Sequence, residues 1–254
     1  LRVNTHIKCV TLNENCLNKD TLSYLCDALK NHPSVINVNL SDSYLDDDCM
    51  PPIATLISRN VSLQSLNLSS NKFESKGLID LFKAIATNNN LQRLVLGFNK
   101  MDDNAMQALH DSLKSNKSIE ILWLSSTDLT PDMIACLVDV EKNRKVINLL
   151  NVSHNEKIGN QGAKYLSELL IKNPSLKSLG LRDANIDDKG ITCIIDKLKH
   201  NYTLQYLDLD AVAEKPPSTL DPLLRKYLTE FDTTQNIISN NNMVLIESLL
   251  DRNK

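Results

Sequence analysis

The 254-residue sequence lacks several features that would point to a location or a class of partner. It has no apolar run approaching the roughly 18 residues that a membrane-spanning helix needs, and its first residues contain no apolar signal-peptide core. Its 28 Lys and Arg residues against 31 Asp and Glu residues give a net charge of -3, so no basic excess marks a nucleic-acid binder. We therefore expect a soluble protein with no membrane span and no nucleic-acid partner.

The six cysteines also lack a recognisable pattern. They include no Cys-x-x-Cys pair and follow no regular spacing. A secreted scaffold held together by disulfides would be shorter and denser in cysteine. We therefore expect free thiols and a reducing, cytoplasmic compartment.

Motifs of catalysis and metal binding are missing as well. The sequence has only six glycines, and its five histidines are scattered, with no phosphate-binding loop, no Gly-x-Ser-x-Gly and no His-x-x-x-His. His32 and His200 fall near predicted helix ends, where a polar or positive group suits the helix dipole. The sequence predicts no catalytic residue, no metal site and no cofactor, and hence a protein that is not an enzyme.

What the sequence does contain is a pattern that recurs every 28 residues. Each repeat opens with an apolar residue, and these openings are Ile7, Val35, Leu63, Leu91, Ile119 and Ile147 and, after one inserted residue, Leu176 and Leu204. In the third repeat the pattern reads Leu63-x-x-Leu66-x-Leu68-x-x-Asn71. The fourth repeat has the same spacing from Leu91 to Asn99.

This pattern resembles the leucine-rich repeat, and a 28-residue strand-plus-helix unit is similar to the ribonuclease-inhibitor-type subfamily. The resemblance covers about residues 7–212. It implies an α/β fold, a right-handed leucine-rich-repeat solenoid of about eight repeats over residues 1–212, shaped like a horseshoe. A parallel sheet would line the concave face and helices the convex face. After Leu209 the pattern fails, and amphipathic segments at about Leu220 to Phe231 and Met243 to Leu250 predict a C-terminal helical cap over residues 213–254.

Local signals within the repeats agree with this arrangement. Alternation in the third repeat predicts that Leu66 points inward and Asn67 outward. The inward helix face of the third repeat is predicted to be Leu78, Leu81, Phe82 and Ile85, and that of the seventh Ile191, Ile194, Ile195 and Leu198. Thr130 before Pro131, and Ser75, are predicted to cap the helices that follow them.

A recurring asparagine closes the strand pattern of four repeats. Asn15, Asn71, Asn99 and Asn155 lie where the chain turns from strand to loop, and the corresponding residues of the other repeats are Ser43, Thr127 and Ala184. We expect the asparagine amides to satisfy backbone groups that the turn leaves unpaired. We call this set the turn ladder and interpret it as structural.

The repeat also predicts which side chains face a partner. The third, fifth, seventh and eighth residues of each repeat should point toward the concave face. They are small and polar in the first three repeats, whereas the middle repeats carry a central patch of Arg93, Val95, Phe98, Ile121, Trp123, Leu149 and His154. Neighbouring strands lie about 4.8 Å apart, so these residues should be contiguous. An aromatic side chain beside an arginine is typical of a binding hot spot, which predicts a partner site there.

Farther along, the same positions carry an acidic rim of Asp183, Asp208 and Asp210. Such a rim favours a basic partner surface and raises its association rate more than its affinity. We include these three residues in the predicted partner-binding site.

The leading hypothesis is a monomeric, non-catalytic module that binds one protein partner on its concave face. The subfamily resemblance implies three roles: inhibitors of secreted ribonucleases, sensor domains of intracellular immune receptors, and eukaryote-like effectors that bacteria deliver into the host cytosol. One alternative comes from the Ran GTPase-activating proteins, which share this repeat type and to whose motif Asp103-Asn104, in the loop after the fourth strand, is faintly similar. A second alternative is a structural spacer in a longer multidomain protein.

Overall fold

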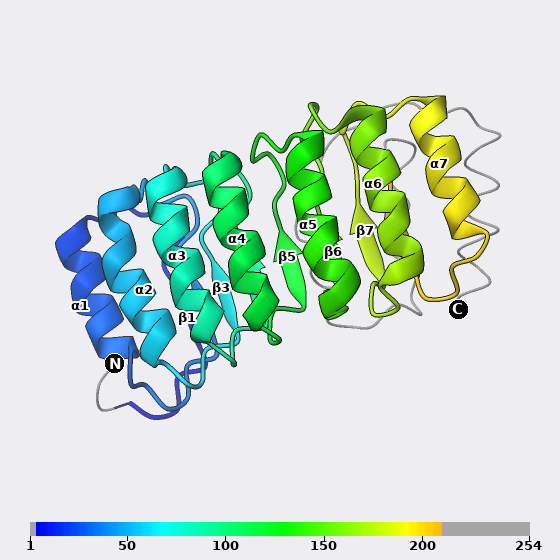
Figure 1. Cartoon of the computed structure of the whole chain (residues 1–254). Helices are drawn as coiled ribbons and strands as arrows, with labels where there is room; N and C mark the ends of the chain where they lie inside the picture. The colour runs from blue at the N-terminus through cyan, green and yellow to red at the C-terminus, as the bar shows by residue number, and fades with distance from the viewer. Residues whose placement is uncertain (1–3, 210–254) are drawn as a thin grey trace. The chain divides into compact units, whose positions relative to one another are not determined.

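The computed structural model describes residues 4–209, along which strands and helices alternate (Figure 1). The chain divides into two compact units, residues 1–128 (unit 1) and residues 129–254 (unit 2). We describe each unit by itself. The eight strands of residues 4–209 confirm the predicted α/β class.

Unit 1 carries five strands that pair in parallel. Its elements are β1 (Cys9–Thr11), α1 (Lys19–Leu29), β2 (Asn37–Asn39), η1 (Asp47–Cys49), α2 (Met50–Arg59), β3 (Ser65–Asn67), α3 (Ser75–Thr87), β4 (Arg93–Val95), α4 (Asp103–Ser115) and β5 (Ile121–Trp123). The register joins Cys9 to Asn37, Asn37 to Ser65, Ser65 to Arg93, and Arg93 to Ile121. Each third residue of a repeat therefore pairs with the third residue of the next, as the 28-residue spacing predicts.

Unit 2 continues the same alternation. Its described elements are α5 (Pro131–Arg144), β6 (Leu149–Asn151), α6 (Gly159–Lys172), β7 (Ser178–Gly180), α7 (Asp188–Leu198) and β8 (Tyr206–Asp208). Leu149 pairs with Ser178 and Ser178 with Tyr206, so the inserted residue before the seventh repeat leaves the register intact. The predicted C-terminal cap at residues 213–254 lies outside the described residues.

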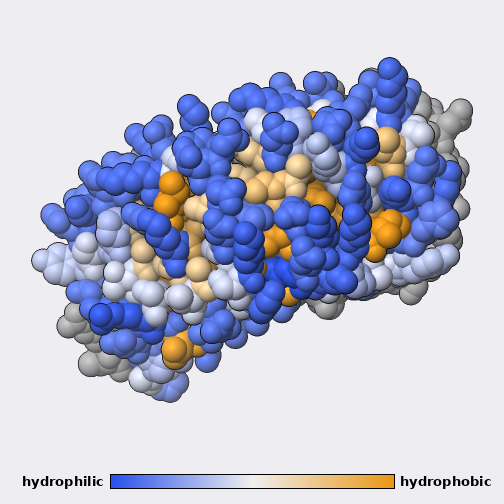
Figure 2. Space-filling view, in the orientation of Figure 1, coloured by the Kyte–Doolittle hydropathy of each residue, from blue (hydrophilic) through white to orange (hydrophobic). Residues whose placement is uncertain are grey.

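In both units the core lies between the strands and the helices. The predicted helix faces are confirmed, since Leu78, Leu81, Phe82 and Ile85 of α3 are completely buried, as are Ile194 and Leu198 of α7. The middle residue of each inner strand points into the same core, as Leu66 and Leu94 do. The helix-bearing side is mostly hydrophilic, with apolar residues showing between polar ones (Figure 2). Within residues 4–209, no helix combines the length and apolar character that crossing a bilayer requires.

Helix starts show one confirmed and one wrong prediction. Thr130 caps α5, because its hydroxyl accepts a hydrogen bond from the Met133 N–H at 3.3 Å. Ser75, in contrast, is the first residue of α3, and its hydroxyl donates to Asp102 at 2.6 Å. The backbone N–H of Glu74 donates instead to Asp47 of the preceding repeat.

The turn ladder is confirmed by its hydrogen bonds. Asn71 Nδ2 donates to the carbonyl oxygens of Leu40 at 2.9 Å and Leu68 at 3.0 Å. Asn71 Oδ1 accepts from the backbone N–H groups of Ser43 and Leu45. Similar amide-to-carbonyl bonds recur at the other three asparagines. Each bond within the ladder thus fixes a turn, and those of Asn71 also join one repeat to the one before it.

Candidate binding surface

Immediately before the ladder residue, every complete strand pattern of the described chain contains a residue in the left-handed backbone region. These eighth residues, which we call the turn row, are Glu14, Asp42, Ser70, Phe98 and Ser126 in unit 1 and His154 and Asp183 in unit 2. Their φ angles run from 48° to 59°. None of them is glycine, although glycine is the residue that tolerates this conformation best.

Hydrogen bonds between repeats hold the turn row in this conformation. The backbone N–H of Ser70 donates to the Gly97 carbonyl oxygen at 2.8 Å, and that of Phe98 donates to the Ser125 carbonyl oxygen at 2.9 Å. In unit 2 the His154 N–H donates to the Arg182 carbonyl oxygen. The hydrogen bonds between neighbouring parallel strands therefore continue past the end of each strand. They fix the backbone position of each turn-row residue.

Phe98 is the apolar member of the turn row and the accessible aromatic of the central patch. Its φ is 58°, and 54% of its surface is exposed. A bulky side chain with a positive φ is uncommon and costs about 1 kcal/mol or more. The neighbouring turn-row residues in unit 1 are Ser70 and Ser126, whose small side chains leave the ring open at both sides. The geometry therefore presents one large apolar group on a rigid backbone.

The other unit 1 residues of the central patch lie together, as predicted, but their expected exposure is wrong. Arg93 pairs with Ile121 and Val95 with Trp123 across β4 and β5. Trp123 is only 2% exposed, Val95 1%, Ile121 4% and Arg93 7%. The strand pattern predicts which way a side chain points, but exposure also depends on what lies over it. These four side chains are buried in this structure and are not exposed to solvent.

In unit 2 the predicted site residues separate into three kinds. Leu149 of β6 is fully buried, which again contradicts the expected exposure. His154 and Asp183 are partly exposed, and His154 Nδ1 lies 2.8 Å from an Asp183 carboxylate oxygen. Asp208 of β8 accepts a hydrogen bond from Arg182 at 3.0 Å, so this part of the acidic rim is engaged within the protein. Asp210 lies outside the described residues.

The residues that resemble a Ran GTPase-activating motif are not in a loop. Asp103 and Asn104 form the first turn of α4, where the residue before them, Asp102, accepts a hydrogen bond from the Ala105 N–H at 2.9 Å. The Ser75 hydroxyl and the backbone N–H groups around Ala105 hold the pKa of Asp102 below its usual range. This turn is a helix cap joined to the preceding repeat.

Comparison with known proteins supports the repeat interpretation. The family model described as leucine rich repeat matches residues 59–82, 87–109, 147–167 and 172–194. These four segments are similar to leucine-rich repeats. Each matched segment contains one strand, β3, β4, β6 or β7, and the first part of the helix that follows it. The match does not decide the subfamily.

Two solved structures are similar to part of the chain. Leiomodin-1 actin-binding site 2 is 23% identical with a TM-score of 0.49, and the match covers 56% of this chain and 82% of that one. The tropomodulin C-terminal domain of Caenorhabditis elegans is 15% identical with a TM-score of 0.50, covering 56% of this chain and 86% of that one. No curated protein matches the sequence. At 15% identity, the likeness to the tropomodulin domain concerns the fold alone.

Proposed function

We propose that this leucine-rich-repeat protein is a non-catalytic binding module whose protein partner contacts the turn row of unit 1, with Phe98 as the anchor. The observation that carries the proposal is an aromatic side chain that is 54% exposed on a left-handed residue. Aromatic anchors dominate the free energy of many protein interfaces. A strained backbone that presents such an anchor is a reason to look for function at that point.

The rest of the turn row fits a partner of opposite charge. Glu14 and Asp42 lie in the same row of unit 1, both are exposed, and Asp128 follows two residues after Ser126. Neighbouring rungs of a parallel sheet are about 4.8 Å apart, so the row extends over a length suited to an extended peptide or a helix. We infer a partner with basic residues around an apolar position that receives Phe98, since acidic side chains at a rim speed association with basic surfaces.

Trp123 has a different role in this proposal. Because it is 2% exposed and paired with Val95, it stabilises the sheet and does not touch a partner in the conformation described here. Truncation of such a buried aromatic costs about 3–5 kcal/mol of stability. The central patch therefore contributes its accessible member, Phe98, and not its tryptophan, to the proposed site.

The proposal also includes a subfamily and a cellular compartment for this protein. The 28-residue repeat supports placement in the ribonuclease-inhibitor-type subfamily, and a sensor or a delivered effector are the roles of that subfamily that we retain. All six cysteines are free thiols, which supports a reducing compartment such as the cytosol. We infer a monomer that binds its partner one to one.

The test is affinity capture from lysates of the source and of a host cell with three forms of the full chain. Wild type is compared with Phe98→Ala and with Tyr202→Ala, a matched control that removes an aromatic side chain 69% exposed on the loop between α7 and β8. A protein retained by wild type and Tyr202→Ala and lost from Phe98→Ala supports the proposal. If both variants retain the captured protein, and circular dichroism shows that both are folded, the proposal is contradicted.

A further inference from the structure

The sequence Asn-x-Ser/Thr, in which x is not proline, occurs at six places in the chain. These places begin at Asn39, Asn60, Asn67, Asn116, Asn151 and Asn201. Asn-x-Ser/Thr is the acceptor sequence of N-glycosylation, and an attached glycan is bulky and needs a surface position. Whether the folded protein can carry a glycan therefore depends on where each asparagine lies.

Three of these asparagines lie buried between a helix and the next strand. Asn60 and Asn116 directly follow α2 and α4, and Asn201 lies three residues after the end of α7. Asn60 is 3% exposed, Asn116 0% and Asn201 3%. Solvent does not reach their amide nitrogens, so a sugar ring has no room there. Asn39 and Asn67 differ, because they lie on β2 and β3 and are partly exposed.

The amide nitrogen that would carry the glycan is also engaged in hydrogen bonds. Asn60 Nδ2 donates to a carbonyl oxygen of the preceding repeat at 2.7 Å, and Asn201 Nδ2 makes the equivalent bond. Asn116 Nδ2 donates to the carbonyl oxygens of Ile85 at 2.9 Å and Asn88 at 2.7 Å. A glycan on any of the three nitrogens would therefore disturb the contact between two repeats.

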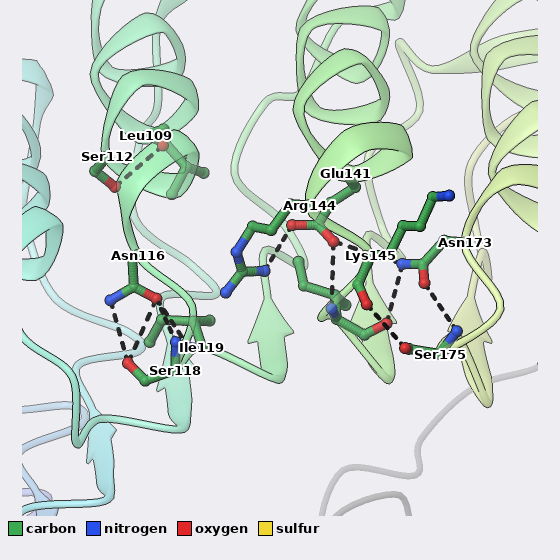
Figure 3. Close-up of polar contacts among 11 residues, drawn as sticks. Leu109, Ser112, Asn116, Ser118, Ile119, Glu141, Arg144, Lys145, Asn173 and Ser175 are labelled. Atoms are coloured by element: carbon green, nitrogen blue, oxygen red, sulfur yellow. Dashed lines mark hydrogen bonds and ion pairs between the residues drawn. The ribbon is translucent and has the colours of Figure 1, made fainter.

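The serine of the acceptor sequence belongs to the same contact. Asn116 Oδ1 accepts from the backbone N–H groups of Ser118 at 3.0 Å and Ile119 at 2.9 Å (Figure 3). The Ser118 hydroxyl donates to the Asn88 carbonyl oxygen, and the Ser62 hydroxyl likewise donates to two carbonyl oxygens of the repeat before it. The acceptor sequence recurs here because the stacking of repeats uses an amide followed by a hydroxyl.

Two other repeats have proline at the middle position of this sequence. Pro33 and Pro174 align with the residue after Asn60, and proline at that place prevents glycan transfer. In the second case the contact is intact, since Asn173 Oδ1 accepts from the Ser175 N–H at 2.9 Å. Proline is tolerated because the residue before it is extended, with a ψ of 131° at Asn60.

We propose that Asn60, Asn116 and Asn201 are latent N-glycosylation sites that the fold keeps closed, and that the chain folds in a compartment where no N-glycan is transferred. In the transfer, the amide nitrogen bonds to the anomeric carbon of a lipid-linked oligosaccharide. The lipid pyrophosphate leaves, and the amide proton passes to water. A chain modified in this way before folding cannot stack its repeats. The inference does not depend on the Phe98 site.

The experiment translates the full chain, behind a cleavable signal sequence, into endoplasmic-reticulum microsomes. The full chain translated without a signal sequence and without microsomes is the reference. Resistance to trypsin in detergent measures folding, and peptide mass spectrometry after enzymatic glycan removal locates the modified asparagines. We expect the reference to resist trypsin. The translocated chain should carry a glycan at one or more of the three sites and be cleaved about tenfold faster or more.

A competing acceptor tripeptide separates the effect of the glycan from that of the microsomal lumen. With the tripeptide present, the translocated chain should stay unmodified and resist trypsin like the reference. Three results would overturn the proposal. They are rapid cleavage that persists without glycans, a trypsin-resistant chain that carries a glycan at one of the three sites, and a translocated chain with none of the three modified.

Proline substitutions give a variant that keeps all three asparagines and their hydroxyl partners. Val61→Pro, Lys117→Pro and Tyr202→Pro together remove the three acceptor sequences. The control is Asn89→Pro, which makes the same change after Asn88, where no acceptor sequence exists. Asn88 is also extended, with a ψ of 132°, so the backbone suits proline there as well.

Both variants also carry Ser153→Ala, which removes the acceptor sequence at the buried Asn151. After translocation, the triple proline variant should resist trypsin, and the Asn89→Pro control should be cleaved like wild type. Equal cleavage of the two would overturn the proposal. If the triple variant does not resist trypsin when made without microsomes, the comparison with the competing tripeptide decides.

Discussion

At the scale of single residues, the turns show a rule that the repeat pattern alone does not express. Where the ladder position holds asparagine, its amide bridges the turn through bonds such as those of Asn71. Where it holds Ser43, Thr127 or Ala184, the next residue also adopts a positive φ, and these residues are Tyr44, Asp128 and Asn185. Without the asparagine amide, the backbone closes the turn with a second left-handed residue. This feature could not be predicted, because sequence spacing does not encode φ.

Strain at Phe98 gives a prediction of stability. Phe98→Ala and Phe98→Gly both remove the exposed ring, but only glycine relieves the left-handed backbone. We expect the glycine variant to have a free energy of unfolding about 0.5–1 kcal/mol higher than the alanine variant, measured by urea titration. Equal stability of the two variants would mean that the turn imposes no strain there.

Asp102 gives a prediction of pH dependence. Its pKa is lowered in the folded protein, mainly by the Ser75 hydroxyl, so its contribution to stability is present above the unfolded pKa of about 3.9 and is lost as the pH falls through the folded value. Asp102→Ala should therefore lower the free energy of unfolding at pH 7 by about 1 kcal/mol. The gap between wild type and variant should close at the acidic end of a pH series. A constant gap would exclude the carboxylate as its cause.

At the scale of elements, the helix ends contain a second asparagine set. Asn60 Nδ2 donates to the Leu29 carbonyl oxygen and Asn88 Nδ2 to the Ile57 carbonyl oxygen, both at 2.7 Å. In the sequence, runs such as Asn88-Asn89-Asn90 look like a compositional bias of loops. Their function is visible only in space, because each amide bonds a carbonyl 31 residues earlier.

One helix end has no asparagine at this position. Arg144, at the end of α5, stands where the neighbouring repeats have asparagine, and its guanidinium lies 2.6 Å from the carboxylate of Glu141 (Figure 3). Both side chains are buried, and Glu141 also accepts hydrogen bonds from the Ile147 N–H and the Asn173 amide. The pair therefore secures the connection from α5 to β6 in unit 2.

Removing the cation should destabilise the protein strongly. Arg144→Ala leaves the Glu141 carboxylate buried without its guanidinium, which costs about 3–5 kcal/mol. The double variant Glu141→Ala, Arg144→Asn restores the residue of the other helix ends and should be less destabilised than Arg144→Ala. Chemical denaturation measures both, and a double variant that is less stable than the single one would contradict this explanation.

At the scale of the whole molecule, the repeat determined strand register, helix faces and the turn ladder well. It could not determine exposure: Trp123 is 2% and Leu149 0% exposed, because the exposed fraction of a side chain depends on its packing in space, which the spacing of the repeat does not specify. The repeat pattern also could not show that Phe98 is a better candidate than Trp123 for the aromatic residue that contacts a partner. That ranking follows from a backbone angle and from the exposed fraction of each ring.

Trp123 makes the burial measurable without mutation, because it is the only tryptophan of the chain. At 2% exposure its fluorescence should be quenched weakly by acrylamide in the folded protein and strongly in urea. Strong quenching in the native state would show an open central patch and would return Trp123 to the list of contact residues.

The most direct test of the proposed function is the affinity of the recovered partner, measured by titration calorimetry with purified wild type, Phe98→Gly and Tyr202→Ala. Phe98→Gly should weaken binding about tenfold or more, about 1.4 kcal/mol or greater, while its fold is preserved. Tyr202→Ala should bind like wild type. Wild-type affinity for Phe98→Gly would contradict the assignment of the turn row as the binding surface.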